Sequence, residues 1–172
     1  MDRLRLVPFE PDAAPQVAAW ATSPREVRDW CGREAERVLP DDLRTWSRSP
    51  DVEAWLLVEP VCRGAAGRID GWRAVGYGEL WLDHEEHEVE LAHLIVDPAR
   101  RGEGLGRALA ARLAARAQAG HPHLPLVVLR VQPGNEAAVR AYRAAGFRPV
   151  TPDVQVAWNQ DQRIAWRWMQ LA

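Results

Sequence analysis

The sequence predicts an α+β fold, in which a mixed sheet has helices on its faces. The chain has 172 residues, of which 47% are hydrophobic and 27% charged, as in an ordinary globular protein with one core. Some short segments alternate apolar and polar side chains as strands do, whereas others repeat apolar side chains at helical spacing. The predicted order is a strand, short helices, antiparallel strands, a helix, a strand, a helix and a terminal hairpin.

The first part of the chain is predicted to contain four strands and three short helices. The strands are expected over residues 4–9, 53–60, 74–83 and 88–97, and the helices over residues 14–21, 25–32 and 39–49. Ser23 and Pro24 provide an N-cap and a first-turn proline for the second helix. A turn is expected at residues 67–71, and a polar hairpin turn at residues 84–87.

The second part alternates helices and strands. Leucines recur every four residues from Leu105, which predicts a helix over residues 105–119 that Gly120 ends. An apolar strand follows at residues 124–131, and a helix begins at the N-cap Asn135 and closes at Gly146. Residues 154–158 and 163–170 are predicted to pair as a terminal hairpin around residues 159–162.

Composition excludes several classes of function. The net charge of −2 gives no tendency to bind nucleic acid or an anionic membrane. Every basic residue is arginine, so Schiff-base lysines and P-loops are excluded. Cys31 and Cys62 lie in no metal spacing, and the sequence has neither an apolar signal-peptide segment nor a run long enough to span a bilayer. We therefore expect a cytoplasmic protein with reduced thiols, in which residues 1–172 form a single domain.

The segment "RRGEGLG", residues 100–106, joins a predicted strand to a predicted helix. A helix N-terminus offers unpaired N–H groups and a partial positive charge, and glycines let an anion approach the backbone. Arg100 and Arg101 add positive charge, which predicts an anion site suited to a pyrophosphate. The spacing is not the G-x-G-x-x-G of Rossmann domains. A purely structural glycine turn is the alternative.

Two blocks of the sequence resemble the GNAT superfamily of acyl-CoA-dependent N-acetyltransferases. The pattern R-x-x-G-x-G is matched by Arg101, Gly104 and Gly106. The pattern N-x-x-A-x-x-x-Y-x-x-x-G-F is matched by Asn135, Ala138, Tyr142, Gly146 and Phe147. The two blocks cover residues 88–147, while the N-terminal third matches only in its predicted layout. The resemblance implies a GNAT-like, mostly antiparallel central sheet flanked by helices on both faces.

The resemblance also implies acetyl-CoA as acyl donor. No set of His, Cys and carboxylate residues has the spacing of a zinc site, so no metal ion is expected. Loop amides would bind the CoA pyrophosphate, so the expected binding residues are Arg101, Gly102, Glu103, Gly104, Leu105, Gly106, Arg107 and Asn135. The end of the preceding strand, Leu94, Ile95 and Val96, would pair with the pantetheine arm as an added strand does. An amide near Leu94 would face the thioester oxygen.

The implied reaction is direct transfer of an acetyl group to a primary amine in a ternary complex. Tyr142 matches the family tyrosine that protonates the leaving thiolate, the alternative being a core tyrosine. Glu90 is the expected base, with Glu88 and Glu79 as rivals. Strand alternation places His93 on the opposite face from Glu90, which favours a structural histidine. His84 and His87 lie in the hairpin turn, where we expect solvent exposure.

In this family the acceptor amine approaches between the first helices and the terminal segment. These regions of the chain contain Trp20, Trp30, Trp46, Trp158, Trp166 and Trp168. Such tryptophans either bind a cationic amine or belong to the core. The terminal hairpin is also a candidate homodimer contact, since exposed tryptophans suit interfaces. The sequence leaves open which small-molecule or peptide amine is the acceptor, and how long the acyl chain is. A non-catalytic acyl-CoA sensor and a nucleotide-binding domain are the alternative functions.

Overall fold

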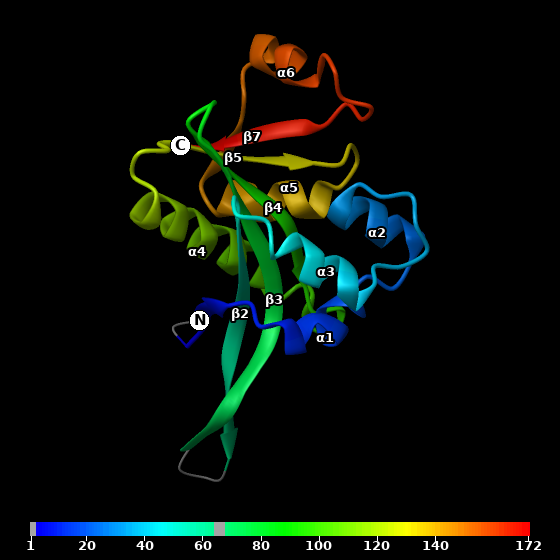
Figure 1. The fold of residues 1–172 in the computed structure, drawn as a ribbon, viewed down its shortest axis with the longest axis vertical. Helices are drawn as coiled ribbons and strands as arrows, with labels where there is room; N and C mark the ends of the chain where they lie inside the picture. Colours follow the sequence, from blue (N-terminus) through cyan, green and yellow to red (C-terminus); the bar gives the residue numbers. More distant parts are fainter. Residues whose placement is uncertain (1–2, 64–67) are drawn as a thin grey trace.

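The computed structural model describes residues 3–63 and 68–172. Its described strands form one seven-stranded sheet in the order β1-β2-β3-β4-β5-β7-β6 (Figure 1). The strands are β1 (Arg5–Pro8), β2 (Val52–Arg63), β3 (Arg68–Asp83), β4 (Glu88–Val96), β5 (Leu126–Val131), β6 (Phe147–Pro149) and β7 (Arg167–Leu171). Neighbouring strands are antiparallel except for the parallel pair β4 and β5. This confirms the predicted mixed, mostly antiparallel sheet.

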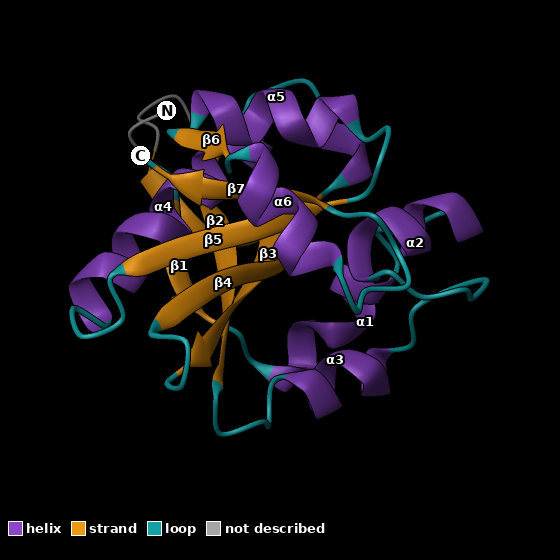
Figure 2. Cartoon of the chain, turned by 90° about the horizontal axis from the view of Figure 1, so that it is seen from above, coloured by secondary structure: helices purple, strands orange, loops and turns teal. Residues whose placement is uncertain are grey.

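Helices cover both faces of the sheet, as predicted (Figure 2). They are α1 (Ala14–Ala18), α2 (Pro24–Cys31), α3 (Pro40–Trp46), α4 (Leu105–Gly120), α5 (Glu136–Ala144) and α6 (Pro152–Asn159), with 3₁₀ turns at Pro11–Ala13 and Pro98–Arg100. On one face, Leu109 and Leu113 of α4 are buried in one cluster with Leu57 of β2. On the other, α1 to α3 bury a second cluster against Tyr77 and Ile95. None of the helices within the described ranges is long and apolar enough to cross a membrane.

Contact between β3 and α4 is especially close at Gly78. A Cβ atom added there would lie 2.7 Å from Cδ1 of Leu113 and 3.3 Å from Cγ of Leu94. The side chain of Leu113 is fully buried, so it has little room to yield.

The variant Gly78→Ala should therefore lower the free energy of unfolding by about 1–3 kcal/mol, because the added methyl group overpacks the core. Gly71→Ala is the matched control on the same strand, since a Cβ at Gly71 meets no atom within 4 Å. Urea denaturation measures both variants. Equal midpoints for the two variants would contradict the close packing at Gly78.

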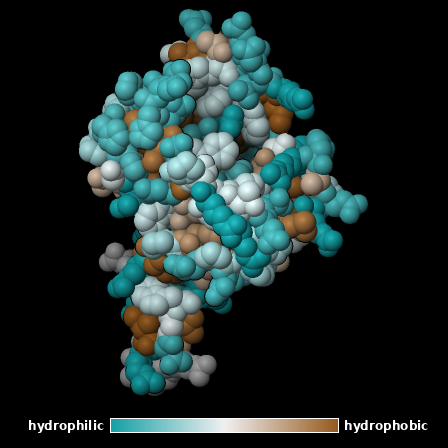
Figure 3. All heavy atoms as spheres, viewed as in Figure 1, coloured by the Kyte–Doolittle hydropathy of each residue, from teal (hydrophilic) through white to brown (hydrophobic). Residues whose placement is uncertain are grey.

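The hairpin of β2 and β3 extends as an arm below the rest of the sheet (Figure 1). The turn predicted at residues 67–71 is wrong for residues 68–71, which lie in β3, and Gly67 is outside the described residues. Cross-strand pairing continues to Arg63 opposite Arg68, and Cys62 lies opposite Ile69. Ile69 and Trp72 favour a strand and are exposed, and Figure 3 shows apolar side chains on this arm.

The terminal hairpin is also wrong, because residues 154–158 belong to helix α6. Thr151 is extended, Pro152 occupies the first turn, and Asp153 follows where an acidic residue is favourable. Val154 and Trp158, four residues apart, pack beside Trp168. Strand β7 instead pairs with β5 and with the short β6. The predicted homodimer contact assumed this terminal hairpin, so its structural basis is absent from these residues.

Strands β4 and β5 separate after a short parallel ladder. Their register covers Glu88–Glu90 against Leu126–Val128, and β5 then continues in register with β7. Across the described chain, the edge of β4 that faces β5 has no strand partner from residue 91 onward. The separation opens the sheet at its centre, and the cleft described below lies there.

Candidate functional site

The separation of β4 and β5 forms a cleft that brings together segments distant in the sequence. Side chains from α2, β3, β4, β5, α5 and the segment before β7 line it. Among the residues predicted from the sequence, the cleft contains Glu90, Leu94, Asn135 and Tyr142. The expected base and the expected acid therefore share one cleft.

Glu90 is nine-tenths buried on β4 and paired with an arginine. Its Oε1 atom lies 2.9 Å from Nε of Arg130 on β5. Burial disfavours the charged carboxylate and raises the pKa of Glu90 to about 7, although Arg130 acts in the opposite direction. A carboxyl group with this pKa exchanges protons readily near neutral pH. Glu88 and Glu79, the rivals, lie at the start of β4 and on β3.

Tyr142 projects from α5 into the same cleft. Its ring packs edge-on against Phe147, with centroids 6.5 Å apart. Burial raises the pKa of Tyr142 to about 12, so its hydroxyl remains protonated and can donate. Asn135 caps α5, where its Oδ1 accepts a hydrogen bond of 3.1 Å from the amide of Ala138. This confirms the predicted N-cap.

The end of β4 presents its backbone edge to the cleft. Leu94 lines the cleft, Ile95 is buried against the α1 to α3 layer, and Val96 packs against the α4 side. The cleft-facing edge of these residues lies beyond the register with β5. It is therefore suited to pair with an extended ligand in the manner of an added strand.

The glycine loop leads directly into α4. Gly102 and Gly104 have positive φ angles of 86° and 81°, and Gly104 is the N-cap, with no side chain to cover the first-turn amides. A Cβ at Gly102 would meet no atom within 4 Å. The exposed glycines and the uncapped helix N-terminus fit a phosphate group. Gly106 lies in the first turn, where a Cβ would be 3.6 Å from Cβ of Ala141 on α5.

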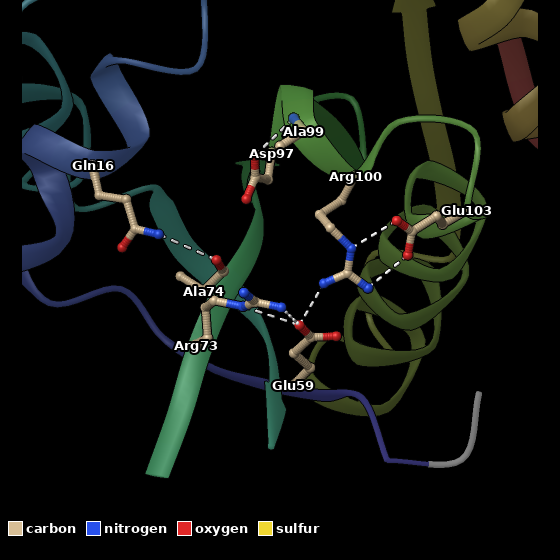
Figure 4. A network of polar contacts seen from close by, with 8 residues as sticks. All are labelled: Gln16, Glu59, Arg73, Ala74, Asp97, Ala99, Arg100 and Glu103. Carbon is tan, nitrogen blue, oxygen red and sulfur yellow. Dashed lines mark hydrogen bonds and ion pairs between the residues drawn. The ribbon is translucent and has the colours of Figure 1, made fainter. Parts of the chain in front are cut away.

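The two loop arginines are bound to carboxylates. Arg101 forms an ion pair with Glu26 of α2, and this pairing lowers the pKa of Glu26 to about 2. Arg100 is hydrogen-bonded to both carboxylate oxygens of Glu103 and to Glu59, as Figure 4 shows. Glu103 therefore holds Arg100. An incoming anion would replace or join these carboxylates.

The remaining loop residues differ in exposure. Leu105, the first residue of α4, is buried in the core, whereas the side chain of Arg107 is exposed on the first turn of the same helix. A ligand at the loop would therefore contact Leu105 through its backbone and not through its side chain. In Figure 4 the carboxylate of Asp97 accepts a 2.9 Å hydrogen bond from the amide of Ala99, which fixes the turn before the loop.

His93 does not face away from Glu90, so the predicted orientation is wrong. The register places Ile95 opposite Tyr77 and Ala92 opposite Glu79, which leaves His93 and Leu94 opposite Gly78. This is a β-bulge, and His93 has a positive φ of 51°. The extra residue breaks the alternation, and the imidazole turns toward the cleft side, where it lies 3.0 Å from a carboxylate oxygen of Glu79.

Arg130 and Trp81 also line the cleft, and neither is among the site residues predicted from the sequence. The guanidinium carbon of Arg130 lies 5.8, 5.4 and 5.3 Å from the ring centroids of Trp81, Trp166 and Trp168. A charged residue inside the apolar run of residues 124–131 was the available signal.

Three of the tryptophans expected at the acceptor pocket lie at or beside the cleft. Trp30 and Trp166 line it, and Trp46 packs against His93. Trp20 is buried in the core, and Trp158 packs edge-on against Trp168 at 5.1 Å. Among the side chains that the structure describes, no group of three His, Cys, Asp or Glu residues is placed to hold a metal ion.

Comparison with known proteins identifies related sequences. The model of the acetyltransferase (GNAT) family matches residues 18–147. A mycothiol acetyltransferase of Kineococcus radiotolerans is 38% identical over 160 residues, which are 90% of this chain and 46% of that protein. A mycothiol acetyltransferase of Thermobispora bispora is 49% identical over 139 residues, which are 72% of this chain and 46% of that protein. The chain spans less than half the length of these curated relatives.

Solved structures share the fold at low sequence identity. A spermidine N-acetyltransferase from Vibrio cholerae in complex with CoA and spermine has a TM-score of 0.67 and 18% identity, covering 88% of this chain and 84% of that one. AAC(6')-Ib in complex with ribostamycin and coenzyme A has a TM-score of 0.70 and 17% identity, covering 99% and 94% of the two chains. At these identities the likeness concerns the fold.

Proposed function

Because the chain belongs to the acetyltransferase (GNAT) family, we propose that it transfers an acetyl group from acetyl-CoA to a primary amine, directly and in a ternary complex. The observation that carries the proposal is the meeting of Glu90, Tyr142 and the free edge of β4 in one cleft. A carboxylate and a phenol beside an extended ligand can serve as the base and the acid that assist acyl transfer from a thioester to an amine.

In the proposed reaction, the first-turn amides of α4 and the guanidinium of Arg101 hold the pyrophosphate of acetyl-CoA. The β4 edge from Leu94 to Val96 pairs with the pantetheine arm, and the amide of Leu94 faces the thioester oxygen. Glu90 accepts a proton from the acceptor nitrogen, and Tyr142 donates a proton to the departing thiolate. The pKa of about 7 suits Glu90 to accept a proton near neutral pH, and the pKa of about 12 keeps the Tyr142 hydroxyl protonated so that it can donate.

We propose a small-molecule amine as the acceptor. The curated relatives are named mycothiol acetyltransferases, and one solved structure contains spermine, so small amines are the first class to test. The cleft offers aromatic walls from Trp30, Trp81 and Trp166, together with the carboxyl groups of Asp29 and Glu90. Such surroundings stabilise a cationic amine by cation–π and charge interactions.

The proposal predicts that acetyl-CoA raises the melting temperature of the protein more than ATP or NAD does, because the cleft and the loop bind it together. A panel of spermidine, spermine and ribostamycin should then include an amine that releases free CoA thiol, detected with a thiol reagent. Stabilisation by acetyl-CoA without thiol release from any amine would favour the acyl-CoA sensor instead. Greater stabilisation by ATP or NAD would favour a nucleotide-binding domain.

A further inference from the structure

We propose that His93, supported by the buried carboxylate of Glu79, is a second proton acceptor of this active site and removes the first proton from the acceptor ammonium group. This inference rests on the proposed function, since it concerns the same cleft and the same reaction. It assigns Nε2 of His93 as the accepting atom and Glu79 as its positioning residue.

The bulge in β4 places the imidazole of His93 in the cleft. A φ of 51° is uncommon for a residue with a side chain, and it is maintained here by the surrounding structure. The indole Nε1 of Trp30 donates a 2.7 Å hydrogen bond to the carbonyl oxygen of His93. This bond fixes the bulge from the side of α2. The next residue, Leu94, supplies the amide that we assign to the thioester oxygen, so the imidazole is adjacent to the reacting centre.

Glu79 is fully buried, and its other contacts leave it facing the imidazole. Its carboxylate accepts hydrogen bonds from the hydroxyl of Tyr77 and from Nε1 of Trp81, the latter at 2.6 Å. The Nδ1 atom of His93 lies 3.0 Å from Oε2 of the same carboxylate. Among the described side chains, Nδ1 of His93 is a buried nitrogen without a hydrogen bond of regular geometry, and this carboxylate oxygen is within hydrogen-bond distance of it.

This contact determines which nitrogen of His93 can accept a proton. A carboxylate beside Nδ1 favours the tautomer with its proton on Nδ1, which leaves the lone pair on Nε2. Trp46 and Trp81 enclose the ring, with centroids 4.3 and 5.0 Å from that of His93. The carboxylate of Glu79 remains beside Nδ1 when Nε2 takes up a proton.

The proton balance of the reaction provides a role for two acceptors. A primary amine is an ammonium ion near neutral pH, so two protons leave its nitrogen during acetyl transfer. The first must leave before the nitrogen lone pair forms the N–C bond to the acetyl carbonyl, and we assign it to His93. The second leaves as the C–S bond breaks, and we assign it to Glu90. Tyr142 protonates the thiolate and recovers one of these protons, while the other passes to solvent.

Charged and titratable groups from several elements face this site. They are Tyr77 and Glu79 of β3, Glu90 of β4, Asp29 and Cys31 of α2, Arg130 of β5, Tyr142 of α5, and Arg33, whose guanidinium lies 4.9 Å from the ring centroid of Trp46. The experiment therefore varies the protonation of the substrate and compares two variants at the same pH. It does not rely on the absolute pH profile of one protein.

The test is His93→Asn, because asparagine tolerates a positive φ but lacks the imidazole. The matched control is His87→Asn, since His87 also has a positive φ, of 55°, but is exposed in the turn between β3 and β4. Turnover is measured with saturating acetyl-CoA and the panel amine that the wild type acetylates fastest. We expect His93→Asn to be slower by about tenfold to a hundredfold at pH 7, and His87→Asn to match the wild type.

The deficit of His93→Asn should shrink at least about tenfold as the pH approaches the pKa of the amine, because neutral amine then needs no first deprotonation. A deficit that is the same at every pH indicates a merely structural role and overturns the proposal, as does full activity at pH 7. The thermal shift with acetyl-CoA shows in each variant that the fold and the donor site persist. A wild type that binds acetyl-CoA but acetylates no amine overturns the proposed function itself, and with it this inference.

Discussion

Replacing Glu90 with glutamine should reduce turnover by about 10²- to 10⁴-fold, the usual contribution of a positioned base. Glutamine has nearly the same shape and can still contact Arg130, but it cannot take a proton from the acceptor. Because burial raises the pKa of Glu90 to about 7, the carboxyl is protonated below that pH and ionised above it. The wild-type rate should therefore rise with pH through about 7, and the Glu90→Gln variant should lose this part of the rise.

Glu88→Gln is the matched control for this change. Glu88 lies on the same strand two residues earlier, and burial also raises its pKa, but the side chain is outside the cleft. It should keep the wild-type rate above pH 7, and its rise with pH should move to somewhat lower pH, because the charge of Glu88 contributes to the raised pKa of Glu90. Equal losses in the two variants, or a pH profile that Glu90→Gln leaves unchanged, would assign the base elsewhere.

Replacing Tyr142 with phenylalanine should reduce turnover by about 10²- to 10³-fold, because the thiolate then departs without a proton donor. The pKa of Tyr142, raised to about 12 by burial, keeps the hydroxyl protonated over the whole range of assay pH. The ring of phenylalanine can retain the edge-on contact with Phe147, so we expect little change in stability. The measurement is kcat and KM for acetyl-CoA with the best amine of the panel.

For Tyr142→Phe we expect kcat to fall while KM for acetyl-CoA remains close to the wild-type value, since the hydroxyl acts as the thiolate leaves. A rise in KM at constant kcat would instead identify Tyr142 as a binding residue. Thermal unfolding in the absence of ligand is the control, and a large loss of stability would identify the core tyrosine that the sequence leaves as the alternative.

Local signals explain what the sequence predicts well. Asn135 caps its helix and Gly104 opens α4 because N-caps and positive φ angles depend on the residue itself and its nearest neighbours. The blocks that resemble the acetyltransferase family lie in the same region. Glu90, Leu94, Asn135 and Tyr142 therefore share the cleft as the motifs imply, although their chemical roles are still predictions.

Tertiary context explains what the sequence does not predict. Residues 154–158 alternate as a strand would, but the helix signal of Pro152 and the packing of Trp158 on Trp168 decide the structure. Arg130 interrupts an apolar strand, and its partners Glu90 and Trp166 come from distant parts of the chain. The bulge at His93 has no sequence signal of its own, because it depends on how β4 aligns with β3.

The bulge gives β4 two opposite phases. Before the bulge, even-numbered residues such as Glu90 face the helices α1 to α3. After the bulge, the odd-numbered residue Ile95 faces these helices. Loss or gain of one residue between these positions would exchange inside and outside for one end of the strand. Either Glu90 or the apolar side chains near Ile95 would then face α4 instead of α1 to α3. The number of residues between Glu90 and the glycine loop is therefore fixed, and we expect this segment to tolerate substitutions better than insertions or deletions.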